Sequence, residues 1–172
     1  EYDRLATAYS CQQKLLQIMS FNNKDLKTNA LMNLALDAED SRNLLMKSQI
    51  INLDFIKKQP ESLIGKFLSG SKQEEIDNKI NQIRESFNAT NMVSLVEAIA
   101  YQEIGEDNAA KKSLDYYNNF IKENYVNNKK LLNRLDLLDS SPINYWTENL
   151  PIINKKIQEI SKNKQTLLKK GN

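Results

Sequence analysis

The chain has 172 residues, and its 24 lysines and arginines against 22 aspartates and glutamates leave a net charge of only +2. Such a small charge does not supply the positive field that draws a protein onto nucleic acid, so we expect no nucleic-acid partner. With no histidine and one cysteine, the sequence also excludes imidazole bases, histidine-dependent nucleophiles, thiolate zinc sites and intrachain disulfides.

Only four glycines and three prolines occur in the sequence, which predicts an all-α protein with short connections. The length suits one domain over residues 1–172, with a point of subdivision near residues 69–71. No apolar run reaches the roughly 20 residues that a membrane span needs. The first residue is Glu1, which fits an exported protein whose signal segment has been removed or a shortened chain, so the compartment stays open.

The first third of the chain has apolar residues at helical spacing. A helix is predicted over residues 2–19, with one face formed by Tyr2, Leu5, Tyr9, Leu16 and Met19. Cys11 lies inside this helix and is expected to be a small core residue. Residues 25–58 carry an apolar pattern too long for one ordinary helix, so we expect two helices with a break near residues 40–42. Pro60 suits the start of a short helix that stops at the "LSG" of residues 68–70.

A new helix is expected to begin at Ser71. Ser71 and Glu74 have the spacing of a capping box. In this motif the serine side chain accepts from a free backbone N–H of the first turn, and the glutamate side chain accepts from the backbone N–H of the cap residue. The apolar face of this helix is formed by Ile76, Ile80, Ile83 and Phe87. The "NAT" of residues 88–90 matches a glycosylation motif, but we interpret it as a boundary between two helices.

The next two helices are predicted over residues 91–104 and from Asp107 to about Tyr125. Gly105 can adopt positive φ at little cost and ends the first of them, and Asp107 can cap the second. These two helices form a hairpin about one glycine.

The rest of the chain predicts more helices, over residues 131–138, from Ser141 and Pro142 onward, and from Pro151 to the end. Segment 149–172 has six lysines and one glutamate, a net charge of +5. Cations in the last turns of a terminal helix complement its dipole. This basic segment is also the one place where we would expect contact with an anionic membrane surface or an acidic partner.

Five residues of segment 94–123 match the small, large and turn positions of an interlocking helical hairpin: Ala98, Tyr101, Gly105, Ala110 and Leu114. Through them the segment resembles a tetratricopeptide (TPR) repeat, a helix–turn–helix unit of about 34 residues. The family's usual Trp, small residue and Pro are replaced by Ser94, Tyr117 and Lys122. Segments one repeat length away in either direction keep little of the pattern. The resemblance implies a stack of helices whose concave surface holds a peptide.

We expect an all-α, irregular antiparallel array of about 7–8 helices with this hairpin in the middle, and a compact helical bundle is the alternative. The favoured function is a non-enzymatic module that binds a peptide or protein partner, with Glu97, Tyr101 and Asn108 contributing near the hairpin turn. The alternative is a compact helical-bundle domain of an exported or cell-surface bacterial protein that binds another macromolecule through an outer face. The sequence does not set the oligomeric state.

No catalytic residue, metal ligand or cofactor is assigned from the sequence. Glu97 and Glu103 are six residues apart and therefore lie on different faces of one helix, so they do not form an acid pair. The acidic cluster of residues 37–40 lacks the alternating oxygen ligands and the glycine of a calcium loop and is interpreted as a solvated helix face. Aromatic residues at helical spacing are expected mainly in the core, and a binding groove is the alternative for four of them: Tyr116, Tyr117, Tyr145 and Trp146.

Overall fold

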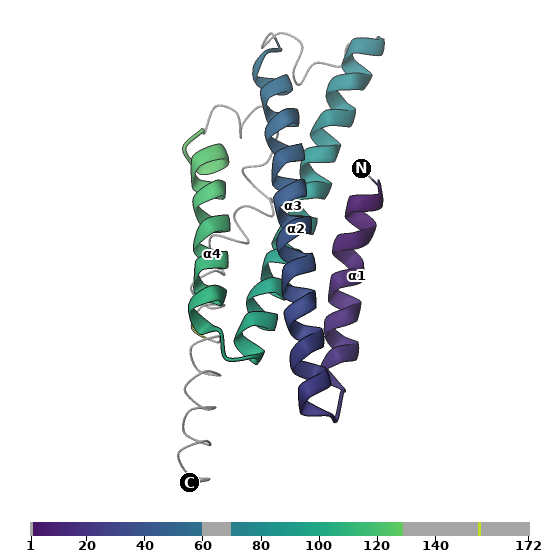
Figure 1. Ribbon diagram of the computed structural model, residues 1–172. Coiled ribbons are helices and arrows are strands. Elements are labelled where there is room, and N and C mark those ends of the chain that lie inside the picture. The colour runs from purple at the N-terminus through teal and green to yellow at the C-terminus, as the bar shows by residue number, and fades with distance from the viewer. Residues whose placement is uncertain (1, 60–69, 129–154, 156–172) are drawn as a thin grey trace.

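The computed structural model describes residues 2–59, 70–128 and 155, and this part of the chain is built from helices and turns (Figure 1). The α-helices are α1 (Tyr2–Met19), α2 (Lys24–Lys57), α3 (Ser71–Glu103) and α4 (Asp107–Ile121). Successive helices run in opposite directions (Figure 1). Helix α1 packs on α2 and α3, and α4 packs on α3. The all-α prediction is thus confirmed for the residues described.

Helix α1 confirms the helix predicted over residues 2–19, but its buried face differs from the predicted one. Tyr9, Leu16 and Met19 are exposed, Leu16 to 62%. The buried residues of the helix are instead Ala8, Cys11, Leu15 and Ile18. Because both sides of this helix carry apolar residues, their spacing did not show which side meets the core. The core position predicted for Cys11 is confirmed.

Helix α2 is continuous, so the predicted break near residues 40–42 is wrong. The helix begins after Asn23, whose side-chain oxygen accepts a hydrogen bond from the backbone N–H of Leu26 at 3.0 Å. Ser41 and Arg42 lie on its buried face, where they continue the three- and four-residue spacing of the apolar side chains. A partner on α3 compensates the charge of Arg42, and the helix can therefore keep its buried face through this point.

Helix α3 is continuous as well, so the predicted boundary at residues 88–90 is also wrong. Thr90 is fully buried, and its hydroxyl donates to the carbonyl of Ser86 one turn earlier at 2.5 Å. This bond satisfies the hydroxyl without interrupting the helix. The helix begins at Ser71 as predicted, although Gly70 holds the cap position. The predicted face is confirmed, with one partly buried and three buried members: Ile80, Ile76, Ile83 and Phe87.

The turn between α3 and α4 forms as predicted. Gly105 has a φ of +88°, the conformation that glycine adopts at little cost. The N–H of Gly105 donates to the carbonyl of Gln102 at 3.0 Å, and the N–H of Glu106 donates to the carbonyl of Tyr101 at 2.9 Å. These two bonds make a Schellman motif, which closes the end of α3. Asp107 is the first residue of α4 and not its cap, a position held by Glu106.

The helix predicted to reach Tyr125 changes character before its end. After Ile121 it continues as a short π-helix, η2 (Lys122–Val126), closed by a bond from the N–H of Asn127 to the carbonyl of Lys122 at 2.9 Å. The short helix predicted after Pro60, all helices predicted after Asn128 and the basic segment 149–172 lie outside the described residues, apart from Lys155. The described part therefore does not reach the expected count of about 7–8 helices.

The buried side chains form two groups of different composition. The small-residue core lies where α1, α2 and α3 meet, and its characteristic members are Ala8, Cys11, Ala35, Ala38, Ala89 and Ala100. The aromatic core joins α2 and α3 to α4 and η2, and its characteristic members are Phe87, Tyr117, Phe120 and Tyr125. The rings of Phe87 and Tyr125 meet edge to face with their centroids 5.2 Å apart.

Candidate binding site

A groove lies between α2 and α4, which both pack on α3. It consists of two adjoining open cavities. The first, of about 480 Å³, contains a network of charged side chains and is called the network cavity. The second, of about 730 Å³, is lined by several side-chain amides and is called the amide cavity. Asn43 of α2 and Tyr116 of α4 line both cavities, so the two cavities adjoin, and together they are called the groove.

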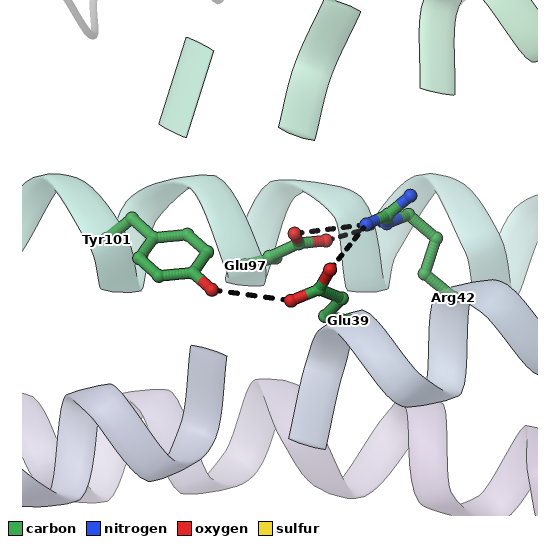
Figure 2. A network of polar contacts seen from close by, with 4 residues as sticks. All are labelled: Glu39, Arg42, Glu97 and Tyr101. Carbon is green, nitrogen blue, oxygen red and sulfur yellow. Dashed lines mark hydrogen bonds and ion pairs between the residues drawn. The ribbon is translucent and has the colours of Figure 1, made fainter. Parts of the chain in front are cut away.

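The network cavity contains a buried ion pair between the two longest helices (Figure 2). Arg42 of α2 donates from Nε to Oε2 of Glu97 at 2.7 Å and from Nη2 to Oε1 of Glu97 at 3.2 Å. Glu39, one turn earlier on α2, lies 3.9 Å from Arg42 Nη2 through its own Oε1. Tyr101 of α3 donates its hydroxyl to Oε2 of Glu39 at 3.4 Å. Four side chains are thus linked across the α2–α3 interface.

Burial determines the electrostatics of this network. Removal from water raises the pKa of the Glu97 carboxyl above its ordinary value, although the hydrogen bonds and charge of Arg42 lower it part of the way. The pKa of Tyr101 is also raised, first by burial and then by the nearby carboxylates of Glu39 and Glu97. Both oxygens of Glu97 accept hydrogen bonds from Arg42, so this carboxyl contributes to the α2–α3 contact.

Two donors beside the network are buried without a partner. Nη1 of Arg42 and Oγ of Ser113 are covered from solvent, and neither makes a hydrogen bond. Ser113 lies close enough to Glu97 to lower its pKa, but not in the geometry of an ordinary hydrogen bond. The ring of Tyr116 covers Arg42, with the guanidinium carbon 4.8 Å from the ring centroid. Tyr116 itself remains 56% exposed.

The structure brings two of the three predicted site residues to the groove. Glu97 and Tyr101 line the network cavity, whereas Asn108 is exposed in the first turn of α4 and is not among the lining residues. Of the aromatic candidates, Tyr117 is buried in the core as expected, whereas Tyr116 projects into the groove. Tyr145 and Trp146 lie outside the described residues.

Sequence reasoning missed Arg42, the residue that holds the network together. The signal was present, because Arg42 stands on the apolar face of α2 and Glu97 stands on the apolar face of α3. A charge on a buried face requires a partner, and two such charges of opposite sign indicate a pair. The prediction of a helix break at residues 40–42 hid this signal.

A second polar layer underlies the groove near the aromatic core. Gln49 of α2 donates from Nε2 to Oγ1 of Thr90 at 2.8 Å and to the carbonyl of Ser86 at 3.3 Å. Its Oε1 accepts from the hydroxyl of Tyr125 at 2.6 Å. Gln49 of α2 is thus bonded both to α3 and directly to η2, which follows the end of α4.

The described residues contain no group of three Cys, Asp or Glu side chains that could hold a metal ion. None of the described helices is long and apolar enough to cross a membrane. Comparisons of the chain with protein-family models, with curated proteins and with solved structures found no match. The function is therefore argued from the groove itself.

Proposed function

We propose that this chain is a non-enzymatic binding module that holds a peptide, or an extended segment of a protein partner, in the groove between α2 and α4. The observation that carries this proposal is the adjacency of two open cavities, which share Asn43 and Tyr116. Two open cavities side by side along the same helices suit an extended chain better than a compact small molecule.

The chemistry of the groove walls supports a peptide ligand. The charged lining residues balance, with Arg42, Lys47 and Lys112 against Glu39, Glu97 and Glu123. The side-chain amides of Asn43 and Asn119 line the groove and make no hydrogen bond to any described residue. Each amide can both donate to and accept from a peptide backbone. The exposed ring of Tyr116 adds a rigid apolar surface, the kind that often contributes most to binding.

The TPR-like hairpin is part of the proposal. Ala98 and Ala110 are buried where α3 meets α4, as expected of small residues at a close helix crossing. The first helix of this hairpin is the last part of α3, which extends back to Ser71. For the chain as a whole, we propose an irregular antiparallel array of helices and not a regular solenoid of short repeats.

The proposal is tested by selecting peptides from a random library that bind the full chain, followed by two matched variants. Tyr116 and Tyr9 are equally exposed, at 56% and 55%, but only Tyr116 lines the groove. Tyr116→Ala should lower the affinity for the selected peptides by about tenfold or more, and Tyr9→Ala should leave this affinity unchanged. Equal loss in both variants, or no loss in either, would place binding elsewhere and contradict the proposal.

A second candidate function is a compact bundle that binds another macromolecule through its outer face. Large apolar side chains stay exposed on α1 and α2, among them Leu16 at 62% and Ile51 at 69%. Neither residue lines the groove. If this face is the binding surface, Leu16→Gln and Ile51→Gln will abolish binding of the selected peptides while Tyr116→Ala has no effect.

A further inference from the structure

The network cavity contains two buried hydrogen-bond donors that make no hydrogen bond of ordinary geometry. The carboxylates beside them already have partners, because both oxygens of Glu97 accept from Arg42, and Glu39 lies near Arg42 and accepts from Tyr101. These donors are Nη1 of Arg42 and the hydroxyl of Ser113, although the Ser113 hydroxyl still lies close enough to Glu97 to lower the pKa of that carboxyl. A buried donor without an acceptor is destabilising, so these two donors favour a ligand that supplies an acceptor.

The charge around the two donors indicates what kind of acceptor fits. Arg42 is already paired with one carboxylate and lies near a second, and Lys112 is the other cation that lines the cavity. Two cations therefore face two carboxylates. Another carboxylate would add a third negative charge beside Glu39 and Glu97, and like charges at short range repel. An uncharged carbonyl oxygen satisfies the donors without this cost.

Access to the two donors depends on Tyr116. Its ring lies over the guanidinium of Arg42, and both donors are covered from solvent in this arrangement. More than half of the Tyr116 side chain is exposed, and its hydroxyl makes no hydrogen bond to any described residue. A cation–π contact at an exposed site is weak, so the ring can turn aside from Arg42.

We propose that the network cavity is a subsite for an uncharged amide carbonyl, from a peptide backbone or an Asn or Gln side chain, which replaces the Tyr116 ring over Arg42 and accepts hydrogen bonds from Arg42 Nη1 and Ser113 Oγ. This subsite rests on the proposed function, because it defines one position of the peptide in the groove. At the network cavity the module would therefore bind backbone carbonyls and amide side chains, and not acidic residues.

The test uses the full chain, labelled with ¹⁵N, and small probes. N-acetylglycinamide should give saturable chemical-shift changes at Arg42, Ser113 and Tyr116, and acetate at the same ionic strength should give none. The matched variants are Ser113→Ala and Ser94→Ala, because both hydroxyls are buried and unpartnered but only Ser113 lines the cavity. Ser113→Ala should lower the affinity for the amide probe by about three- to tenfold without lowering the melting temperature. Ser94→Ala should leave the affinity for the probe unchanged.

Three results would overturn the subsite: stronger shifts with acetate than with the amide, no saturable shift near Arg42, or equal binding to the Ser113→Ala variant. The peptide selection described above separates this failure from failure of the proposed function. If selected peptides lose affinity in Tyr116→Ala but the amide probe does not bind, the groove stands and the carbonyl subsite does not. If Tyr116→Ala leaves the affinity of the selected peptides unchanged, both proposals fail.

Discussion

The two cores of this molecule are built differently, although they share helices α2 and α3. The small-residue core beneath α1 is made of alanines, one cysteine and aliphatic side chains, and α1 adds an exposed ion pair, Lys14–Asp37, at 3.9 Å. The aromatic core beneath α4 lies beside the buried pair Arg42–Glu97 and the polar layer of Gln49. The first side holds helices close together, whereas the second side combines packing with buried polar groups that must be paired.

This difference shows where function can reside. Small apolar residues allow helices to approach closely and leave little space between them. On the other side, α2 and α4 both pack on α3, and the groove lies between them. Buried polar groups are costly unless they are paired, and the pairs Arg42–Glu97 and Gln49–Thr90 both lie on the side of the aromatic core.

The largest loss of stability is expected from substitutions that break the buried charge pair. Arg42→Met leaves Glu97 buried without its cation and should cost about 3–5 kcal/mol of unfolding free energy, and Glu97→Leu should cost a similar amount. The double variant should recover most of the lost unfolding free energy, because two apolar side chains leave no buried charge without a partner. Urea unfolding measures all three.

The matched control is Lys14→Met, which breaks the exposed pair on the opposite side and should cost about 0–1 kcal/mol. Additive losses in the Arg42 and Glu97 variants would show that the two side chains do not act as a pair.

A smaller effect is expected from overpacking the crossing of α3 and α4. Ala98→Leu and Ala110→Leu should each cost about 1–3 kcal/mol, because both alanines are buried where the two helices meet. Ala6→Leu, at an exposed position of α1, serves as the control and should change the stability little. Thermal melting reports the difference. Unchanged melting in both hairpin variants would remove the comparison with a TPR hairpin.

Alkaline pH should weaken the aromatic core specifically. Burial raises the pKa of Tyr117 and Tyr125 well above the ordinary value of 10.0, so the folded state keeps both hydroxyls protonated while the unfolded state ionises. Their contribution to stability is complete below pH 10.0 and declines as the pH rises above that value.

The variant Tyr125→Phe should show a smaller loss of stability between about pH 9 and pH 11 than the unaltered chain. At neutral pH it should be less stable by about 1–3 kcal/mol, because Gln49 loses its donor. Tyr9→Phe, at an exposed position, should leave the pH dependence unchanged. If the slope for Tyr125→Phe equals that of the unaltered chain, Tyr125 is not a source of the alkaline loss.

The smallest effect concerns the small-residue core and leaves stability untouched. Cys11 is fully buried, and removal from water raises the pKa of its thiol. A thiol reagent should modify the folded chain about a hundredfold or more slowly than the chain in denaturant, because modification requires local opening. Absorbance of the released reagent group follows the reaction. Labelling at comparable rates would show that the α1 side is loosely packed.

Local chemistry in the sequence predicts the ends of the helices better than their continuity. The stop at Gly105 is found, and a helix begins at Ser71, although Gly70 and not Ser71 is its cap; the cap at Asn23 was not predicted. The two predicted breaks at 40–42 and 88–90 are wrong because partners distant in sequence satisfy the polar residues there. Glu97 compensates Arg42 across 55 residues, and Gln49 bonds Thr90 across 41.

The site was predicted in part for the same reason. Glu97 and Tyr101 were named from their place on the inner helix of the hairpin, and both line the groove. The opposite walls come from α2 and from the outer side of α4, and nothing local to Arg42 or Tyr116 indicates that they face each other. The position of Asn108 near the turn indicates where the hairpin bends, but it does not indicate which surface of the hairpin lines the groove.

The central claim is that the groove between α2 and α4, and not the apolar outer face of α1 and α2, binds the partner. It is tested most directly by mapping the backbone chemical shifts of the ¹⁵N-labelled chain during titration with a selected peptide. We predict that the largest changes fall on groove residues such as Asn43, Tyr116 and Asn119. Largest changes around Leu16 and Ile51, with the groove residues unmoved, would contradict the account.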